Sequence, residues 1–372
     1  MRPELSTKPG VVRDVIVVGP RMDSQGGIAQ VTSTYAAAGL FNGPSHGFRV
    51  RHFPSTVDGS SARKLAYGLR RVLRFAFESV PPGSIVHLHT TWRGSIWRKA
   101  AYAWLARRRR ALVIHHLHAF GLLDTLAGSG GVSRWLIRST LTRADALIVL
   151  TPAMADRARA AFPGVPVHVV PNPVEPFPPE SSKTARDPAL VAYLGWFIPE
   201  KGVFDLLDAL VLLHRRGCDV RVALAGSHNR DGLRAGIVAR GLEESAVDGG
   251  WLDRSEVASL LRRCAVLAHP SHQEGFGLVL VEAMACGTPI VTCPVGGVPD
   301  VLIEGRNAVF VPPGRPDRLA DALEAILADE EMRAAMGRAG PSDARRFEPA
   351  GVIDTLRRTY AACLPGGRKA AS

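Results

Sequence analysis

Two carboxylates, Glu274 and Glu282, stand eight residues apart in a stretch that is otherwise small and apolar, HPSHQEGFGLVLVEAMACGTPIV (269–291). An ionised carboxylate is costly to bury without a partner. Either these two side chains reach solvent, or something binds them. The Gly-Phe-Gly turn between them predicts the start of a helix, where unpaired backbone amides bind anions. Its glycines would let a ligand approach the backbone closely.

A carboxylate on the helix after this turn can accept hydrogen bonds from two vicinal hydroxyls. A phosphate at the turn with a hydroxylated ring on either side describes a nucleotide sugar. The alternative is an ordinary helix N-terminus with a favourable acid nearby and a solvated Glu282. The Glu-x7-Glu spacing alone does not decide between them, so the elements around it must.

Short apolar runs that end in loops predict parallel strands in the first half of the chain. Helical patterns lie between them, such as those over 63–80 and 133–143. Apolar strands that alternate with helices indicate a parallel sheet covered on both faces. The predicted strands are 11–18, 84–89, 111–118, 146–151 and 167–172.

A proline-rich segment over 171–188 interrupts this alternation, which then begins again. We predict a first domain over 1–175, a linker over 176–188, a second domain over 189–350, and a C-terminal helix and tail over 351–372. Ligands of such sheets bind beyond the carboxyl ends of the strands. In the second domain the predicted strands are 189–195, 220–226, 265–271 and 289–293, and the predicted helices are 203–215 and 278–285.

Five motifs, in order along the chain, resemble those of the retaining glycosyltransferases of family four. They are GGIAQV, VPNPV, LGWFIPEKG, PSHQEGFGLVLVEAMACGTPIV and GGVPDVL. The resemblance covers nearly the whole chain. It implies the GT-B fold, an α/β architecture of two Rossmann-like domains that face each other across a cleft, with the C-terminal helix returning to the first domain.

The resemblance also implies roles for individual residues. Glu282 would hold the ribose hydroxyls of the donor, and Glu274 would contact the transferred sugar. Lys201 would neutralise the leaving diphosphate, where a fixed cation stabilises developing charge, and His118 would contact the donor sugar. Backbone groups would hold the sugar or its phosphates at Gly26, Gly27, Phe276, Gly277 and Leu278.

One position departs from the family pattern. Trp196 stands where the family has an arginine after the glycine, so one diphosphate cation is missing from its expected place. Trp196 would stack on a ring or merely pack. Arg21 and Arg93 are the candidates to compensate for the lost charge, and Arg93 is equally a candidate for an acceptor phosphate. The alternative for Arg93 is a capped turn, with the neighbouring Arg98 and Lys99 in water.

We expect neither a metal ion nor a dinucleotide cofactor. No Asp-x-Asp pair is visible, the histidine spacing fits no metal site, and Gly19, Gly26 and Gly27 do not form GxGxxG after the first strand. The histidines at 87, 115 and 116 are predicted to be strand residues with local hydrogen bonds. The nucleotide sugar is a co-substrate.

The charge of the chain is uneven. Residues 1–171 hold 23 Lys and Arg against 8 Asp and Glu, whereas residues 172–372 hold 23 against 26. The first half therefore suits an anionic partner: a phosphorylated substrate, an anionic membrane or nucleic acid. Nucleic acid is disfavoured, because no aromatic platform is interleaved with the basic residues. Arg-rich solvated faces are the plain alternative.

We expect a cytoplasmic protein that also binds peripherally at the inner face of the plasma membrane. The first ten residues have no signal-like apolar core, no apolar run is long enough to span a membrane, and five unclustered cysteines suggest reduced thiols. In the helix predicted over 63–80, leucines share one face and arginines the other. That pattern favours leucines packed on the sheet, with a helix lying on a membrane as the alternative.

The leading functional hypothesis is a metal-independent, retaining hexosyltransferase. It would transfer a sugar from a nucleoside diphosphate to a glycan or polyprenyl-linked acceptor in bacterial surface-polysaccharide biosynthesis. The second hypothesis is a catalytically silent homologue that acts as a binding or scaffold subunit. Trp196 favours the second hypothesis, and the intact Glu274, Glu282, Lys201 and His118 favour the first.

Overall fold

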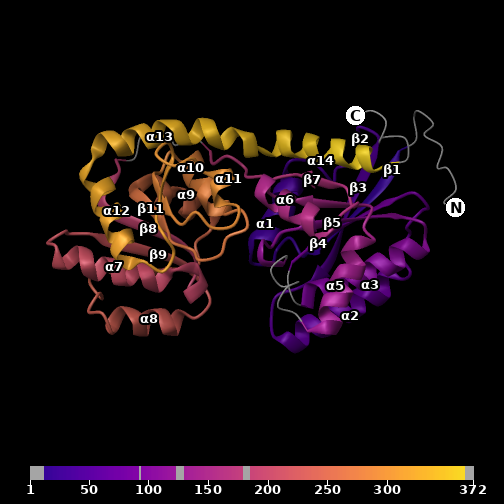
Figure 1. Ribbon diagram of the computed structural model, residues 1–372, viewed down its shortest axis with the longest axis horizontal. Coiled ribbons are helices and arrows are strands. Elements are labelled where there is room, and N and C mark those ends of the chain that lie inside the picture. Colours follow the sequence, from indigo (N-terminus) through magenta and orange to yellow (C-terminus); the bar gives the residue numbers. More distant parts are fainter. Residues whose placement is uncertain (1–11, 92–93, 123–129, 179–184, 365–372) are drawn as a thin grey trace. The chain divides into compact units, whose positions relative to one another are not determined.

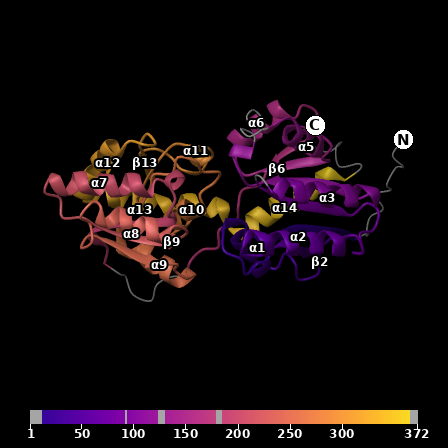
Figure 2. The same cartoon turned by 90° about the horizontal axis from the view of Figure 1, so that it is seen from below.

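The computed structural model describes residues 12–91, 94–122, 130–178 and 185–364. The chain forms two compact units, one of residues 1–174 and 347–372 and the other of residues 175–346. Each unit is built around its own sheet, and helices lie on both sides of each sheet (Figures 1 and 2). The two-domain α/β architecture expected from the sequence is confirmed.

The sheet of the first unit has the strand order β2-β3-β1-β4-β5-β6-β7, and all its pairs are parallel except β2 with β3. The strands are β1 (Arg13–Pro20), β2 (Pro44–Ser45), β3 (Phe48–Thr56), β4 (Ile85–Thr90), β5 (Leu112–Leu117), β6 (Ala146–Val149) and β7 (Val167–Val169). The helices are α1 (Gly27–Ala37), α2 (Ser61–Phe75), α3 (Gly94–Arg108), α5 (Gly131–Thr142), α6 (Pro152–Ala161) and α14 (Pro349–Cys363).

The C-terminal helix α14 belongs to the first unit, as expected. Its Tyr360 is buried, and the Tyr360 hydroxyl lies 2.7 Å from Nδ1 of His87 on β4. The Tyr360 ring also meets Phe48 of β3 edge-on. Helix α14 is therefore fixed to the first sheet by a buried polar contact as well as by apolar packing.

The sheet of the second unit is wholly parallel, with the order β10-β9-β8-β11-β12-β13. Its strands are β8 (Asp187–Trp196), β9 (Arg221–Ser227), β10 (Ala246–Gly250), β11 (Cys264–His269), β12 (Ile290–Thr292) and β13 (Ala308–Phe310). Its helices are η1 (Pro199–Lys201), α7 (Val203–Arg215), α8 (Arg230–Val238), α9 (Arg254–Arg263), α10 (Leu278–Ala285), α11 (Val298–Val301), α12 (Pro316–Ala328) and α13 (Glu330–Ala344), and the short η2 (Arg345–Phe347) follows them.

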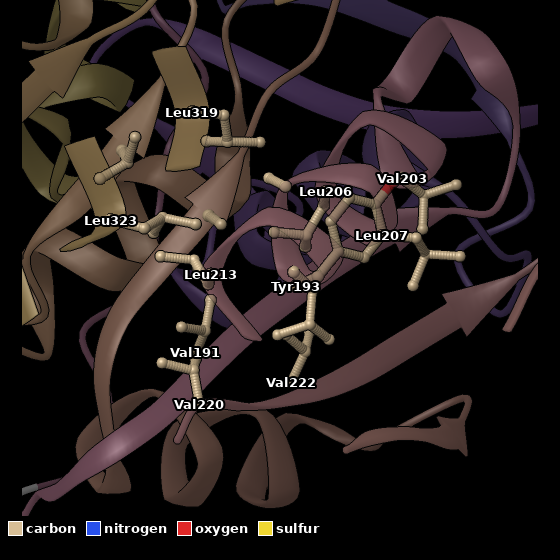
Figure 3. Close-up of a cluster of buried hydrophobic side chains, with 14 of the residues drawn as sticks. Val191, Tyr193, Val203, Leu206, Leu207, Leu213, Val220, Val222, Leu319 and Leu323 are labelled. Carbon is tan, nitrogen blue, oxygen red and sulfur yellow. The ribbon is translucent and has the colours of Figure 1, made fainter. Parts of the chain in front are cut away.

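The core of the second unit lies between its sheet and the helices α7 and α12 (Figure 3). Val191 and Tyr193 of β8 meet the leucines of α7, which repeat at helical spacing and are fully buried. Burial of such side chains is worth roughly 1.5–3 kcal/mol each. This packing holds the carboxyl ends of β8 and β11 in fixed positions, and the candidate site is at those ends.

Arg186 lies in the segment predicted as a linker, yet it is folded into the second unit. Its guanidinium donates to the carbonyls of Leu261 and Cys264 at the end of α9 and of Cys286 and Gly287 at the end of α10. A cation suits these positions because the last carbonyls of a helix are unpaired and carry partial negative charge.

The expected packing of α2 is wrong. The helix contacts its own unit through Gly68, Val72 and Phe75, whereas Leu65, Leu69 and Leu73 are exposed. Phe75 is fully buried against the rings of Phe53 and Tyr102. This aromatic side chain, and not the leucines, therefore anchors α2 to its unit.

Candidate functional site

The candidate site of the second unit lies at the carboxyl ends of β8 and β11. The strands that follow β8 along the chain, β9 and β10, continue the sheet on one side, and β11 lies on the other. Such a switch in strand order is where open parallel sheets bind ligands. Trp196 is the last residue of β8, Lys201 ends the short helix η1 that follows it, and the loop after β11 carries Glu274.

Glu274 is the centre of a polar network. Its Oε2 lies 2.8 Å from Nζ of Lys201 and 3.3 Å from Nε2 of His269. Its Oε1 accepts from the amides of Gly275 and Gly277, each at 3.1 Å. Burial opposes ionisation, but the hydrogen bond from His269 and the charge of Lys201 hold the pKa of the Glu274 carboxyl well below its usual range. Glu274 is therefore a carboxylate at neutral pH, and His269 must carry its proton on Nε2 to donate to it.

Two glycines are required by this geometry. Gly202 has φ +69°, and a Cβ atom there would lie 2.0 Å from the carbonyl oxygen of Pro270. Gly277 has φ +76° and precedes the first residue of α10. Both conformations are left-handed, which side chains other than glycine rarely adopt. Gly202 thus brings the Lys201 loop against the Glu274 loop.

The amides predicted to hold sugar or phosphate are placed at this turn. The amide of Gly277 donates to Glu274, so the carboxylate occupies part of the expected anion site. Phe276 is buried, and Leu278 is the first residue of α10 and half-buried. A bound anion would therefore share the helix start with Glu274.

Glu282 is buried on α10, which answers the question raised by its charge. Its Oε1 lies 3.9 Å from Nη1 of Arg254. Arg254 also donates to the carbonyl of Pro176, and its guanidinium lies 4.4 Å from the centre of the Phe177 ring. Arg254 was missed from the sequence because it belongs to no quoted motif and meets Glu282 only in the folded unit.

Trp196 is 41% exposed, so it does not fill the core. Its ring lies 4.4 Å, centroid to centroid, from the ring of His228 after β9. His228 and Asn229 both have positive φ, at 68° and 42°, which is strained backbone of the kind that clusters at functional sites. Apart from its position after a predicted strand, nothing in the sequence pointed to His228.

In the first unit, Gly26 and Gly27 lie at the start of α1, after the carboxyl end of β1. Gly26 has φ +120°, and no atom would meet a Cβ there within 4 Å, so its surroundings are open. Arg21 is paired with Asp23 through Nε at 2.8 Å. The cation that was expected to replace the family arginine therefore has an acidic partner, as Lys201 has in the second unit. Arg93 lies outside the described residues.

Histidines line the carboxyl end of β4 and β5. His118 follows β5, and its Nε2 lies 2.6 Å from Nδ1 of His89. His87 contacts His116 at 3.2 Å, and His115 contacts the hydroxyl of Thr90 at 3.0 Å. Burial lowers the pKa of His87, His115 and His118 to about 3. The expectation of hydrogen-bonded strand histidines is confirmed, and at neutral pH these imidazoles are uncharged.

Three of these histidines, His87, His89 and His116, place nitrogen atoms within 4.8 Å of one another. Their rings are stacked, with interplanar angles of 23–29°. His87 makes hydrogen-bonding contacts through both ring nitrogens, with Tyr360 and with His116. Among the described residues, Nε2 of His89 and Nε2 of His116 have no hydrogen-bond partner.

Lys99 of α3 is buried, contrary to the interpretation that placed it in water. Its Nζ donates to the carbonyl of Val18 at 2.7 Å and to Oγ of Ser55 at 2.9 Å. Burial holds the pKa of its amine well below the usual range. Within the described part of the chain it has no acidic partner, so it fixes the end of β1 by hydrogen bonds alone.

Comparisons with known proteins agree with this geometry. Residues 13–173 match the glycosyl transferase 4-like domain, and residues 176–343 match glycosyl transferases group 1. The chain is 30% identical over 307 residues to a D-inositol 3-phosphate glycosyltransferase of Segniliparus rotundus, covering 75% of this chain and 68% of that protein. It is 29% identical over 244 residues to the alpha-D-kanosaminyltransferase of Streptomyces kanamyceticus, covering 62% and 63%.

Two solved structures share the fold at low identity. Sucrose-phosphate synthase from Thermosynechococcus elongatus superposes with a TM-score of 0.74 at 20% identity, covering 94% of this chain and 98% of that one. Anabaena HepE in complex with UDP-glucose gives 0.73 at 20% identity, covering 94% and 99%. Together with the sequence matches, these likenesses show that the chain is a glycosyltransferase of family four with the GT-B fold.

Proposed function

We propose that the chain transfers a sugar from a nucleoside-diphosphate sugar to a glycan or lipid-linked acceptor, with retention at the anomeric carbon and without a metal ion. The observation that carries the proposal is the Lys201–Glu274–His269 network at the carboxyl ends of β8 and β11. It joins a fixed cation to a fixed carboxylate at the edge where open parallel sheets bind ligands.

Lys201 supplies the charge that the reaction needs. When the bond between the sugar and the diphosphate breaks, negative charge develops on the departing phosphate oxygen. A cation already held in place stabilises that charge without reorganising during the step. Lys201 is held by Glu274 and by the carbonyl of Gln273 at 3.2 Å, and this positioning takes the part that Mg²⁺ plays in other enzymes.

Glu274 and Glu282 accept hydrogen bonds from hydroxyl groups of the donor. Glu274 stays ionised because Lys201 and His269 hold it so, and a carboxylate accepts from sugar hydroxyls more strongly than a neutral group. Glu282 holds the ribose, with Arg254 keeping its charge compensated. His118, uncharged at neutral pH, offers the transferred sugar a neutral hydrogen-bonding ring.

Known relatives support a nucleotide sugar as the donor, but they do not identify one class of acceptor. One similar structure holds UDP-glucose, and one relative is named as acting on an inositol phosphate. We place the acceptor in bacterial surface-polysaccharide synthesis at the cytoplasmic face of the membrane. This placement rests on the segment HLHTTWRGSIWRK (87–99), which resembles segments of exopolysaccharide-assembling members of the family, and on the basic first unit.

The test is a thermal-shift screen with UDP, GDP and ADP, followed by their sugars. A ligand at 100 times its Kd stabilises the folded protein by about 2.7 kcal/mol. We expect one diphosphate to stabilise strongly, its sugar to be turned over in the presence of EDTA, and the product to keep the anomeric configuration of the donor. Inversion, or a requirement for a divalent metal, would overturn that part of the proposal.

A silent binding subunit is the second candidate, and Trp196 is the observation that favours it. The expected arginine is absent from that position, and Arg21 is paired with Asp23. The two candidates differ in turnover but not in binding. Stabilisation by a diphosphate with no donor turnover on any acceptor would favour the silent subunit, and gain of turnover in Trp196→Arg would explain why.

A further inference from the structure

Three neighbouring helices of the first unit expose large apolar side chains to solvent. Their exposed fractions run from 49% to 90%. The residues are Leu65, Leu69 and Leu73 of α2 with Phe77 just beyond it, Trp97 and Trp104 of α3, and Val132 and Trp135 of α5. We call this set the α2–α3–α5 face. Clusters of this kind on a soluble protein mark a surface that binds something.

The leucines of α2 are not needed to hold the helix in place. They repeat every four residues along one side, which makes a continuous stripe. The other side of the helix makes the contacts with the fold. Phe75 is buried there, and Arg71 donates to the carbonyl of Pro54 at 2.8 Å with its guanidinium 4.1 Å from the centre of the Phe53 ring. The leucine stripe is therefore free to serve a partner.

The three helices form one surface. A Cβ atom at Gly68 of α2 would lie 2.8 Å from the side chain of Arg98 on α3, so these two helices are in close contact. Helix α3 also contacts α5. All three lie on the same side of the seven-stranded sheet, at the lower right of Figure 1 and toward the viewer in Figure 2.

The charge of this surface has one sign. The three helices contain eleven Lys and Arg residues, five in α2, four in α3 and two in α5, and no Asp or Glu. Most of these cations are exposed beside the apolar side chains: Arg63, Lys64, Arg70, Arg74, Arg108, Arg134 and Arg138. Arginine and lysine can keep the charged end in water while the stem covers apolar surface.

We propose that the α2–α3–α5 face inserts its leucines and tryptophans into the interface of an anionic lipid bilayer, with its arginines on the lipid phosphates. An amphipathic helix with apolar residues on one side and cations on the other lies in such an interface, and tryptophan is enriched there. Each cation near the surface adds to the attraction. The inference deepens the proposed function, because it names the surface on which a lipid-linked acceptor would be met.

Charge complementarity decides against the other occupants. A second copy of this chain would bring the same cations together, and like charges at an interface cost free energy. A nucleic acid would satisfy the arginines and could stack on the exposed tryptophans, but it would leave the aliphatic leucine stripe of α2 in water. An anionic bilayer satisfies both the cations and the leucines.

The test is co-sedimentation of the full chain with vesicles. We expect pelleting with vesicles of equal parts phosphatidylcholine and phosphatidylglycerol at 0.1 M salt, and little with phosphatidylcholine alone. Raising the salt to 1 M shortens the Debye length from about 10 Å to about 3 Å. Because the apolar insertion survives screening, release at 1 M salt should be partial. Bromine-labelled acyl chains should quench the fluorescence of Trp97 and Trp104.

Variants separate insertion from simple attraction. Replacing Leu65, Leu69 and Leu73 with glutamine should weaken vesicle binding at least tenfold. The matched control replaces exposed apolar residues of the second unit, Val238 and Val247, with glutamine and should bind like the wild type. Replacing Arg70 and Arg74 with glutamine should weaken binding mainly at low salt. Arg71 is left intact because it packs on Phe53.

Several outcomes would overturn the proposal. They are absence of pelleting with phosphatidylglycerol, wild-type binding by the leucine variant, self-association that the leucine variant abolishes, and a preference for single-stranded RNA over vesicles. Stabilisation by UDP, GDP and ADP is measured on the same samples. Nucleotide binding without vesicle binding removes this inference alone, and vesicle binding without nucleotide binding removes the proposed function alone.

Discussion

The two units share one plan but treat buried polar groups in opposite ways. In the second unit two carboxylates lie beside opposite charges, half-buried Glu274 beside Lys201 and buried Glu282 near Arg254. In the first unit the buried ionisable groups are imidazoles and tyrosines, which are neutral at pH 7, and Lys99, which has hydrogen bonds to neutral groups. The difference shows that the second unit keeps paired charges where the proposed chemistry uses them, whereas the cations of α2, α3 and α5 in the first unit lie mostly on the surface.

The largest expected effect is a difference in acid stability between the units. The folded pKa of His87, His115 and His118 is about 3, below the ordinary value of 6.5. The unfolded chain therefore binds protons that the folded chain excludes, and stability present above pH 6.5 is lost as the pH falls toward 3. Each fully shifted imidazole removes up to about 1.4 kcal/mol per pH unit.

In the second unit the corresponding loss begins lower. The pKa of Glu274 is depressed from 4.5, so its contribution is complete above that value and falls only below it. Hydrogen exchange followed by mass spectrometry, corrected for intrinsic rates, should show peptides of β4 and β5 losing protection between pH 6.5 and 4.5 while peptides of β8 and β11 keep theirs. Equal loss of protection in both units over this pH range would show that they do not differ in acid stability.

The next effect concerns catalysis in the second unit. Lys201→Ala should lower kcat by about 10²–10³-fold, the usual result of losing one preorganised group that stabilises developing charge, and should change donor binding less. Steady-state kinetics with the cognate donor measure both. Arg216→Ala is the matched control, because Arg216 pairs with Asp321 and Glu324 on the exposed side of the same unit. If KM rises and kcat is preserved, Lys201 is a binding residue only.

A smaller effect is expected at Glu282. Glu282→Ala should weaken binding of the cognate diphosphate by about 1.5–3 kcal/mol, the range for a hydrogen bond to a charged group, and should leave the fold intact. Calorimetric titration gives the affinity, and Glu324→Ala on α12 is the control carboxylate. Unchanged affinity in a folded Glu282 variant would show that the ribose is held elsewhere.

The sequence predicted the helices and strands with strong local patterns well, but not the features that depend on tertiary contacts. Helices α7 and α10 have the boundaries that their periodicity predicted, and the strands that bound the site lie within two residues of their predicted limits. Strand β3 was not predicted, because residues 48–56 mix charged residues and a proline with apolar ones. Its place in the sheet depends on pairing with β1, in which Arg13 pairs with Phe48, 35 residues later in the chain.

The side of α2 that faces the fold could not be read from its pattern. Periodicity gives the two sides of a helix but not which one is inward. The leucine stripe predicted an inward face, and the fold instead uses Gly68 for close approach to α3 and Phe75 as an anchor. Likewise Arg254 and His228 meet Glu282 and Trp196 only through tertiary contacts, for which no local signal exists.

The smallest effect is expected when the hydroxyl is removed from each of two buried tyrosines of the first unit. The hydroxyl of Tyr360 lies 2.7 Å from His87, whereas the hydroxyl of Tyr102 is buried and has no hydrogen-bond partner among the described residues. Tyr360→Phe leaves a buried imidazole nitrogen unpaired and should cost about 1–3 kcal/mol of unfolding free energy. Tyr102→Phe removes an unpaired group and should be neutral or stabilising.

Both rings keep their packing in these variants, because Phe retains the edge-on contacts with Phe48 and with Phe75. Thermal unfolding should therefore separate them, since 1 kcal/mol shifts Tm by about 2–4 °C for a unit of this size. A lower Tm for Tyr360→Phe together with an unchanged or higher Tm for Tyr102→Phe would show that the imidazole array of the first unit depends on α14 as a hydrogen-bonding partner. Equal shifts in the two variants would mean that α14 is held by apolar packing alone, and that the neutral array contributes nothing to the return of the C-terminal helix.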